Sequence, residues 1–264
     1  MNTIKKIFLL VTLTILMINC SSDNSENNSS TFEINLSPSA TSVVIDQAFT
    51  ITVNANEEIK EMWVSTDNFA TGGYSLRSFG NNYTLNFNFD TLGSKTIAVR
   101  AKNQNNVVSE KQVIIAVTRG NAIKINGLQV VSFNGINTTF DPEYPTTNPN
   151  HLADLRFGFS KIKLGNPLDN NYSSVLWYLS SVIENQGLMT WDCSSANLYL
   201  NPNASLKFGL ADIDNGIAGA DLLNGPPDYR EINFSNYLVT KPTTITYSFP
   251  EINLEFKLFV EWAN

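Results

Sequence analysis

Residues 204–221 read ASLKFGLADIDNGIAGAD, and this stretch decides the fold because it combines a clear strand pattern with a cluster of acids at the strand's end. Leu206, Phe208 and Leu210 alternate with small or polar residues. A period of two is typical of a β-strand with one buried face. The stretch therefore predicts a half-buried strand that ends in acidic residues.

The acidic residues at the end of this strand are the main candidate site. Asp212 and Asp214 continue the alternation and are expected on one side of the strand, and we expect the following loop to return Asp221 towards them. Three like charges would repel, and Ca²⁺, which takes about 6–8 oxygen ligands, would remove that repulsion. The alternative is that these acids are ordinary turn residues closing a hairpin.

Short alternating runs also recur through the rest of the chain. They include Phe32–Leu36, Phe49–Val53, Ile59–Val64, Tyr83–Phe89, Thr96–Ala101, Val113–Val117 and the final run Ile252–Trp262. Runs of this length with turn residues between them favour β-sandwiches. We predict an all-β protein with two β-sandwich domains, residues 31–119 and 121–264, joined at Arg119–Asn121.

The end of the first predicted domain resembles a known type of module. Residues 92–117, LGSKTIAVRAKNQNNVVSEKQVIIAV, are similar to the last two strands of an immunoglobulin-like or polycystic-kidney-disease-type (PKD) domain. The resemblance implies a stalk or spacer, and the disulfide pair of antibody domains is missing. Trp63 lies in an apolar run and is expected in the core.

The N-terminus has the pattern of an export signal. Lys5 and Lys6 precede the apolar run Ile7–Ile18, which is typical of a signal peptide (residues 1–19). Cys20 follows at once, and the segment resembles a bacterial lipoprotein signal with lipidation at Cys20, although Asn19 replaces the usual small residue. The polar composition of residues 20–30 predicts a disordered tether and resembles that of Bacteroidetes surface lipoproteins. The resemblance implies a lipid anchor in the outer membrane, facing the exterior. The alternative is a plain secretory signal with a polar linker.

Charge and cysteine content exclude several classes of function. The net charge is −7, and removal of residues 1–19 takes away two lysines and no acid, which gives −9. Such a chain is not expected to bind nucleic acid, which requires basic surface. Once Cys20 is lipidated, Cys193 has no partner, so stability is expected to come from burial of the core, to which a bound metal would add, and not from disulfides.

The second half of the chain resembles a C2 domain, a calcium-binding β-sandwich. The resemblance rests on a long polar loop, residues 134–153, that carries Asp141 and closes on Asp154, and on the later Asp-x-Asp with a further acid. It implies Asp141 and Asp154 as ligands from the first loop, and Asp212, Asp214 and Asp221 as ligands from the third. Two departures are a longer first loop and one extra residue before Asp221. Phospholipid binding does not carry over, because the loops lack a basic cluster.

No catalytic motif stands out, so we expect a binding protein and not an enzyme. The first hypothesis is a non-catalytic surface lipoprotein whose immunoglobulin-like stalk presents a calcium-binding C2-like module for protein or envelope contacts. The alternative is a glycan-binding lipoprotein in polysaccharide capture, with Trp177, Tyr178 and Trp191 stacking on sugars. An exposed row of these aromatics would favour the alternative, whereas their burial together with convergence of the five aspartates would favour the first hypothesis. His151 and Cys193 are expected to be structural.

Overall fold

The computed structural model describes residues 31–77 and 80–263. The predicted signal peptide (1–19), the tether (20–30) and Cys20 lie outside the described residues. The described part consists of strands and five short 3-10 turns, so the predicted all-β fold is confirmed. Within it, every helical segment is too short to cross a membrane. The 3-10 turns are η1 (Pro149–His151), η2 (Glu184–Gln186), η3 (Ser194–Ala196), η4 (Ser235–Tyr237) and η5 (Pro250–Ile252).

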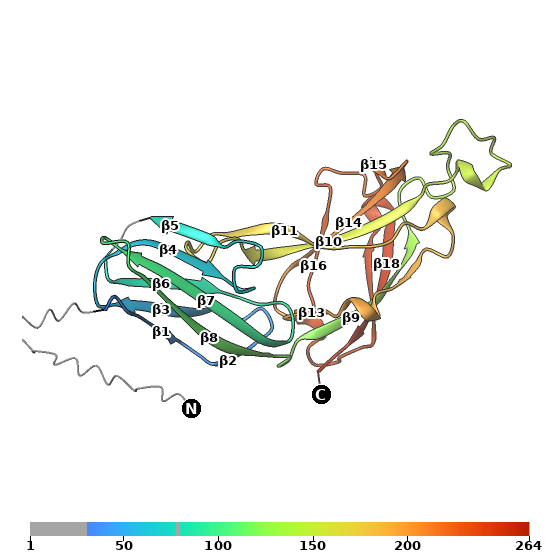
Figure 1. The fold of residues 1–264 in the computed structure, drawn as a ribbon. Helices are drawn as coiled ribbons and strands as arrows, with labels where there is room; N and C mark the ends of the chain where they lie inside the picture. The colour runs from blue at the N-terminus through green and yellow to red at the C-terminus, as the bar shows by residue number, and fades with distance from the viewer. Residues whose placement is uncertain (1–30, 78–79, 264) are drawn as a thin grey trace, which may run out of the picture. The chain divides into compact units, whose positions relative to one another are not determined.

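The first sandwich has two sheets (Figure 1). One sheet has the order β1-β3-β6, with β1 (Ile34–Pro38), β3 (Phe49–Ala55) and β6 (Asn82–Phe87). The other has the order β2-β8-β7-β4-β5, with β2 (Ser42–Val44), β8 (Val108–Thr118), β7 (Gly93–Asn103), β4 (Ile59–Ser65) and β5 (Tyr74–Arg77). An immunoglobulin-like sandwich likewise places its B and E strands in one sheet and its C, F and G strands in the other. Here β3 and β6 take the first role, and β4, β7 and β8 take the second.

The second sandwich has two sheets, each of five strands. The first has the order β11-β10-β14-β15, with β16 also paired to β14, and comprises β10 (Leu155–Leu164), β11 (Tyr172–Leu179), β14 (Leu206–Asp214), β15 (Ile217–Asp221) and β16 (Arg230–Ile232). The second has the order β12-β9-β18-β17, with β13 also paired to β9, and comprises β9 (Ile123–Ser132), β12 (Thr190–Asp192), β13 (Leu198–Leu200), β17 (Thr244–Phe249) and β18 (Leu254–Glu261).

Each sandwich has its own hydrophobic core. In the second, Phe208 and Phe256 stack across the two sheets with ring centroids 4.2 Å apart. The first core also takes in Ala122 and Leu168, which follow the predicted boundary at residue 120. The chain from Phe32 onward nevertheless forms one compact unit. The domain limits 31–119 and 121–264 therefore remain a prediction. Ala122 and Leu168 depart from it, because they lie after residue 120 but pack in the first core.

Polar contacts also join the two sandwiches. Lys161 on β10 is 2% exposed, and its Nζ lies 2.7 Å from an Asp46 carboxylate oxygen. Lys163 pairs with Asp90 at 2.7 Å, and the Tyr83 hydroxyl donates to the Leu168 carbonyl at 2.6 Å. These contacts join side chains of the first sandwich to β10 and to the segment between β10 and β11. The two sandwiches are therefore joined by these side-chain contacts as well as by the linker at Arg119–Asn121.

Trp63 is not a core residue, so that prediction is wrong. On β4 the buried positions are Met62 and Val64, and Trp63 is half-buried on the outer face of its sheet. A register irregularity between Ile59 and Glu61 sets this phase. The ring is covered instead by Lys102, whose Nζ lies 5.4 Å from the ring centroid.

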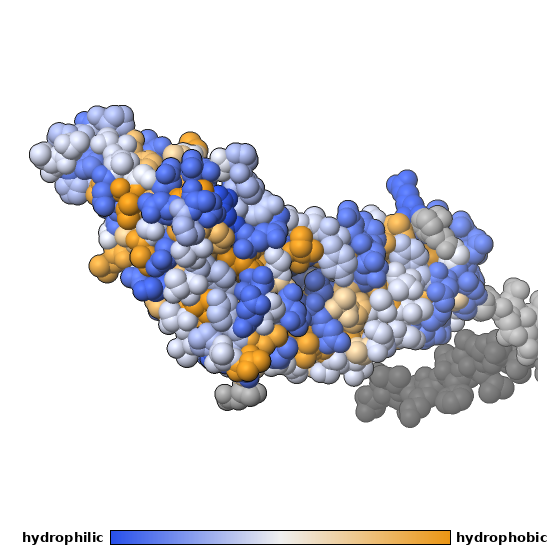
Figure 2. Space-filling model, turned by 180° about the vertical axis from the view of Figure 1, so that it is seen from behind, coloured by the Kyte–Doolittle hydropathy of each residue, from blue (hydrophilic) through white to orange (hydrophobic). Residues whose placement is uncertain are grey.

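Figure 2 shows hydrophobic residues interspersed with hydrophilic ones over one face of the molecule, the ordinary pattern of a protein surface.

Candidate functional site

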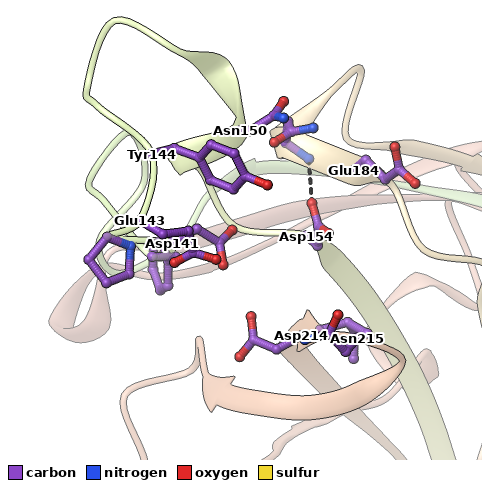
Figure 3. A pocket seen from close by; sticks show the side chains of 12 residues that line it. Asp141, Glu143, Tyr144, Asn150, Asp154, Glu184, Asp214 and Asn215 are labelled. Carbon is purple, nitrogen blue, oxygen red and sulfur yellow. Dashed lines mark hydrogen bonds between the residues drawn. The ribbon is translucent and has the colours of Figure 1, made fainter.

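Four of the five predicted metal ligands lie at one end of the second sandwich. The segment between β9 and β10, the segment after β11 and the end of β14 meet around a pocket of about 410 Å³, called here the acidic pocket (Figure 3). Its polar lining consists of Asp141, Glu143, Tyr144, Asn150, Asp154, Glu184, Asn185, Asp214 and Asn215. Asp212 lies beneath it. The sequence prediction that the first and third loops converge agrees with this arrangement.

Asp154 is held in place from three sides. Its backbone N–H donates to Asp212 Oδ1 at 2.8 Å, and its carbonyl accepts the N–H of Ile213 at 2.8 Å. Its Oδ1 accepts the N–H of Asn185 at 2.7 Å, the contact drawn in Figure 3. These bonds fix one carboxylate oxygen of Asp154 and leave the other for a ligand.

Asp212 has a structural contact that the sequence did not reveal. It continues the inward face of β14 after Leu206, Phe208 and Leu210, and it is 3% exposed. Burial raises the pKa of Asp212, and the charges of Asp214 and Asp141 raise it further, whereas the N–H groups of Asp154 and Ile213 oppose the shift. Its role is to satisfy a backbone donor under the pocket and not to face the pocket itself.

Asp141 and Asp214 approach each other from opposite sides of the acidic pocket. Asp141 belongs to the segment between β9 and β10, whereas Asp214 ends β14. Burial raises the pKa of Asp141, and the neighbouring charges of Glu143, Asp214 and Asp154 add to the rise. Negative charge is therefore concentrated where a cation would be stabilised.

Asp221 does not lie in the acidic pocket, and the expectation that the chain returns it there is wrong. Asn215 and Gly216 both have positive φ, 52° and 82°, so β14 and β15 form a tight two-residue hairpin. Strand β15 then runs back along β14 and pairs Asp221 with Ala211, on the outer face of the sheet. There Asp221 accepts the N–H groups of Leu223 at 3.0 Å and Gly225 at 2.8 Å.

The structure adds acids that sequence reasoning missed. Glu143 follows Asp141 by two residues in the same loop, so Asp-Pro-Glu was a usable signal. Glu184 comes from the segment after β11, which no spacing pattern connects to the other acids. Within residues 31–77 and 80–263, however, no three or more His, Cys, Asp or Glu side chains are arranged to hold a metal ion as they stand. The donor types suit Ca²⁺, but the carboxylates would have to draw closer around it.

The aromatic candidates do not form an exposed row. Trp191 is 4% exposed, and its indole N–H donates to the Ser181 carbonyl at 2.9 Å. Trp177 is half-buried under Lys161, whose Nζ lies 4.3 Å from the ring centroid. Burial and a hydrogen bond with Cys193 raise the pKa of Tyr178 to about 12. The sequence-based criterion for preferring the calcium hypothesis is met only in part, because Trp191 is buried and the other two rings are half-buried, but only Asp141, Asp154 and Asp214 of the five aspartates line the acidic pocket.

His151 and Cys193 have local structural surroundings. His151 is 9% exposed, and its Nδ1 lies 3.4 Å from the Thr139 hydroxyl. Cys193 is a buried free thiol. The burial of both side chains agrees with the structural role expected for them.

Comparison with known proteins gives a broad structural likeness and no family. No protein-family model matches the chain, and no curated protein matches it. Among solved structures, a PKD domain of an M14-like peptidase from a Thermoplasmatales archaeon is 13% identical, with a TM-score of 0.28, over 33% of this chain and 96% of that one. Fibronectin(III)-like modules of Clostridium thermocellum CbhA are 8% identical, with a TM-score of 0.28, over 76% of this chain and 93% of that one. Carbohydrate-binding modules of the β-sandwich superfamily are 10% identical, with a TM-score of 0.27, over 88% of this chain and 98% of that one. These similarities carry no argument about ligands.

Proposed function

We propose that this protein is a non-catalytic, lipid-anchored surface protein whose second sandwich binds Ca²⁺ in the acidic pocket. The observation that carries the proposal is the convergence of Asp141, Asp154 and Asp214 on one pocket from distant parts of the sequence. Hard carboxylate and amide oxygens are the ligands that Ca²⁺ takes in proteins. In this proposal the ion holds the segment between β9 and β10 against the end of β14 and presents it for protein or envelope contacts.

The residues proposed to hold the ion are Asp141, Asp154 and Asp214, with Glu143 and Glu184 as further donors. The segment between β9 and β10 is the part that would have to move, because the acids are not arranged around an ion as they stand. Asp212 and Asp221 are not proposed as ligands. Asp212 is used by the Asp154 N–H, and Asp221 lies on the outer face of the sheet.

Thermal unfolding with calcium and with chelator tests the proposal. We expect millimolar Ca²⁺ to raise the melting temperature of the chain from residue 21 onward, since a ligand that binds only the folded state at about 30 times its Kd stabilises by roughly 2 kcal/mol. Asp214→Asn should abolish the rise. The matched control is Asp169→Asn, at an exposed turn remote from the pocket, which should retain it. An equal melting temperature in calcium and chelator contradicts calcium binding.

The proposed cellular location is tested by separate experiments. The proposal places the protein in the outer membrane, anchored through lipid on Cys20 and facing the exterior. Replacement Cys20→Ala should abolish incorporation of labelled fatty acid and release the protein from the membrane fraction. Protease added to intact cells should cleave the wild-type chain. Protection of the chain from protease would contradict the exterior orientation, and unchanged labelling of the variant would contradict lipidation at Cys20.

A further inference from the structure

A second cavity lies on the outer face of the sheet that contains β10 and β14. It has a volume of about 370 Å³ and is called here the outer trough; its lining includes Arg156, Gly158, Leu179, Gly209, Asp221 and Asp228. The strand register explains the layout: Arg156 pairs with Ala211, which pairs with Asp221, and in the next row of the same face Gly158 pairs with Gly209. The volume is within the range of about 300–1,000 Å³ that is usual for small-ligand sites.

The floor of the outer trough is bare backbone at Gly209, whereas the Leu176 and Leu179 side chains lie within 3.6 Å of the Cβ position at Gly158. Gly158 and Gly209 face each other on the two central strands, at positions where the alternation requires an outward side chain. A Cβ on Gly209 would meet only the Asp228 carbonyl oxygen, at an ordinary 3.7 Å, so folding does not exclude a larger residue there. Glycine weakens a strand interior and often marks a place where a ligand approaches the backbone. The floor therefore has the form expected for a flat ligand.

Arg156 supplies a positive charge that has no partner in residues 31–77 and 80–263. Its Nε is buried without a hydrogen-bond acceptor, and no ion pair or hydrogen bond of its side chain is found among the described residues. Buried polar atoms are nearly always satisfied, so such an atom calls for an acceptor from outside the chain. A guanidinium binds a carboxylate through two parallel N–H···O bonds, and a ligand carboxylate would provide both acceptors.

The remaining lining is suited to hydroxyl groups and a C–H surface. Asp221 and Asp228 present carboxylates, which accept hydrogen bonds from hydroxyls and repel a second carboxylate. Each Asp221 oxygen accepts one backbone N–H and keeps further acceptor capacity. Leu179, which is 48% exposed, provides an apolar wall on the β11 side. Together these groups would orient a ligand with its carboxylate towards Arg156 and its hydroxyls towards the two aspartates.

We propose that the outer trough binds a uronic acid residue of an acidic polysaccharide. The ring lies on Gly209 and against Leu179, the sugar carboxylate pairs with Arg156, and ring hydroxyls donate to Asp221 and Asp228. This site is separate from the acidic pocket, and none of the proposed calcium ligands lines it. It also differs from sugar stacking on Trp177, Tyr178 or Trp191, because its platform is the sheet backbone.

Calorimetric titration of the chain from residue 21 onward with a galacturonate trisaccharide tests this inference. We expect saturable binding that weakens at least tenfold in Arg156→Gln, because a charge-assisted bidentate contact is lost. Arg77→Gln is the matched control, since Arg77 is an exposed arginine of the first sandwich, and it should bind as the wild type does. Gly209→Val, which fills the floor of the outer trough, should also weaken binding at least tenfold, and a melting curve confirms that this variant folds.

Two comparison ligands separate the sources of affinity. A neutral trisaccharide of glucose should bind at least tenfold more weakly than the galacturonate, and glycine, which carries a carboxylate without sugar hydroxyls, should not bind measurably. The inference is overturned if Arg156→Gln binds galacturonate as the wild type does, or if the neutral sugar or glycine binds as tightly. Each titration is run in calcium and in chelator. Binding that is equal in both shows that the outer trough works independently of the proposed calcium site.

Discussion

Asp212 Oδ1 accepts the backbone N–H of Asp154 at 2.8 Å, and this bond joins the inner face of β14 to the start of β10 beneath the acidic pocket. The acceptor is a buried carboxylate, and the donor belongs to a residue whose own side chain faces the pocket. The position of a candidate ligand therefore depends on an acid that is not itself exposed to the ligand.

Asp212→Ala should destabilise the protein by about 1–3 kcal/mol, because it leaves the Asp154 N–H without an acceptor. Asp212→Asn should cost much less, since its amide oxygen takes the same place. Urea unfolding of the two variants in chelator measures the difference without any contribution from the proposed calcium site. If both variants lose equal stability, the charge of Asp212 and not its acceptor oxygen is what matters.

The raised pKa of Asp212 also predicts a pH dependence of stability. A carboxyl whose pKa is higher in the folded state than the ordinary 3.8 binds its proton more tightly when folded, so its contribution to stability is lost as the pH rises through the folded-state pKa. Asp212→Asn removes this titration. The free energy of unfolding of the variant minus that of the wild type should therefore rise with pH above 3.8 and level off above the folded-state pKa.

Subtracting the wild type in this way matters because other acids titrate in the opposite direction. Hydrogen bonds from Ser65 and Thr71 lower the pKa of Asp67 to about 2, and its contribution is lost only as the pH falls towards that value. A difference that stays flat between pH 3.8 and about pH 7 would contradict the raised pKa of Asp212.

The sequence predicted the parts of this fold that depend on strict alternation. Residues 206–214 and the final strand were expected as strands with one buried face, and both are found, as β14 and β18. The sequence did not indicate which residues of β4 point into the core, because Met62, Trp63 and Val64 are all apolar. A register irregularity between Ile59 and Glu61 further breaks the simple alternation along this strand.

The candidate site was predictable only where loops follow from the strand pattern. Asp141, Asp154 and Asp214 were expected at one end of the sandwich, and they line one pocket. The misplacement of Asp221 was avoidable, since Asn-Gly between two strands is the strongest sequence signal for a two-residue hairpin. Glu184 and Arg156 were not predictable, because what matters for each is a neighbour in space that no spacing in the sequence indicates.

Cys193 should be unreactive in the folded protein. Burial raises the pKa of the Cys193 thiol, and the charge of Asp192 raises it further, whereas the hydrogen bond with Tyr178 opposes the shift. The thiolate is the reactive form, so alkylation at about pH 8 should be slow in the native state and fast in denaturant. Mass spectrometry of the chain from residue 21 onward, which holds no other cysteine, gives both rates. Equal rates would show that the thiol is accessible in the folded chain.

Lys161 and Asp46 form a buried ion pair between the two sandwiches. The side chains are 2% and 12% exposed, and the Asp46 Oδ2 also accepts the Asn201 N–H at 3.0 Å. Asp46→Ala should cost about 3 kcal/mol, because it strips a buried ammonium of its nearest counter-charge and leaves Asp90 at 3.7 Å as the remaining one.

The double variant Lys161→Met with Asp46→Asn tests whether the ion pair itself stabilises the protein. The alternative is that removing one partner is costly only because it leaves the other charge buried and unpaired. Methionine keeps the apolar stem over Trp177, asparagine keeps an acceptor for the Asn201 N–H, and Asp90 retains Lys163 at 2.7 Å. Replacing both partners of a buried ion pair is often close to neutral, so the double variant should lie within about 1 kcal/mol of the wild type. Urea unfolding of Lys161→Met, Asp46→Asn and the double variant, each compared with the wild type, gives the coupling energy. A double variant as unstable as Asp46→Ala would mean that the ion pair itself, and not the avoidance of an unpaired charge, holds the two sandwiches together.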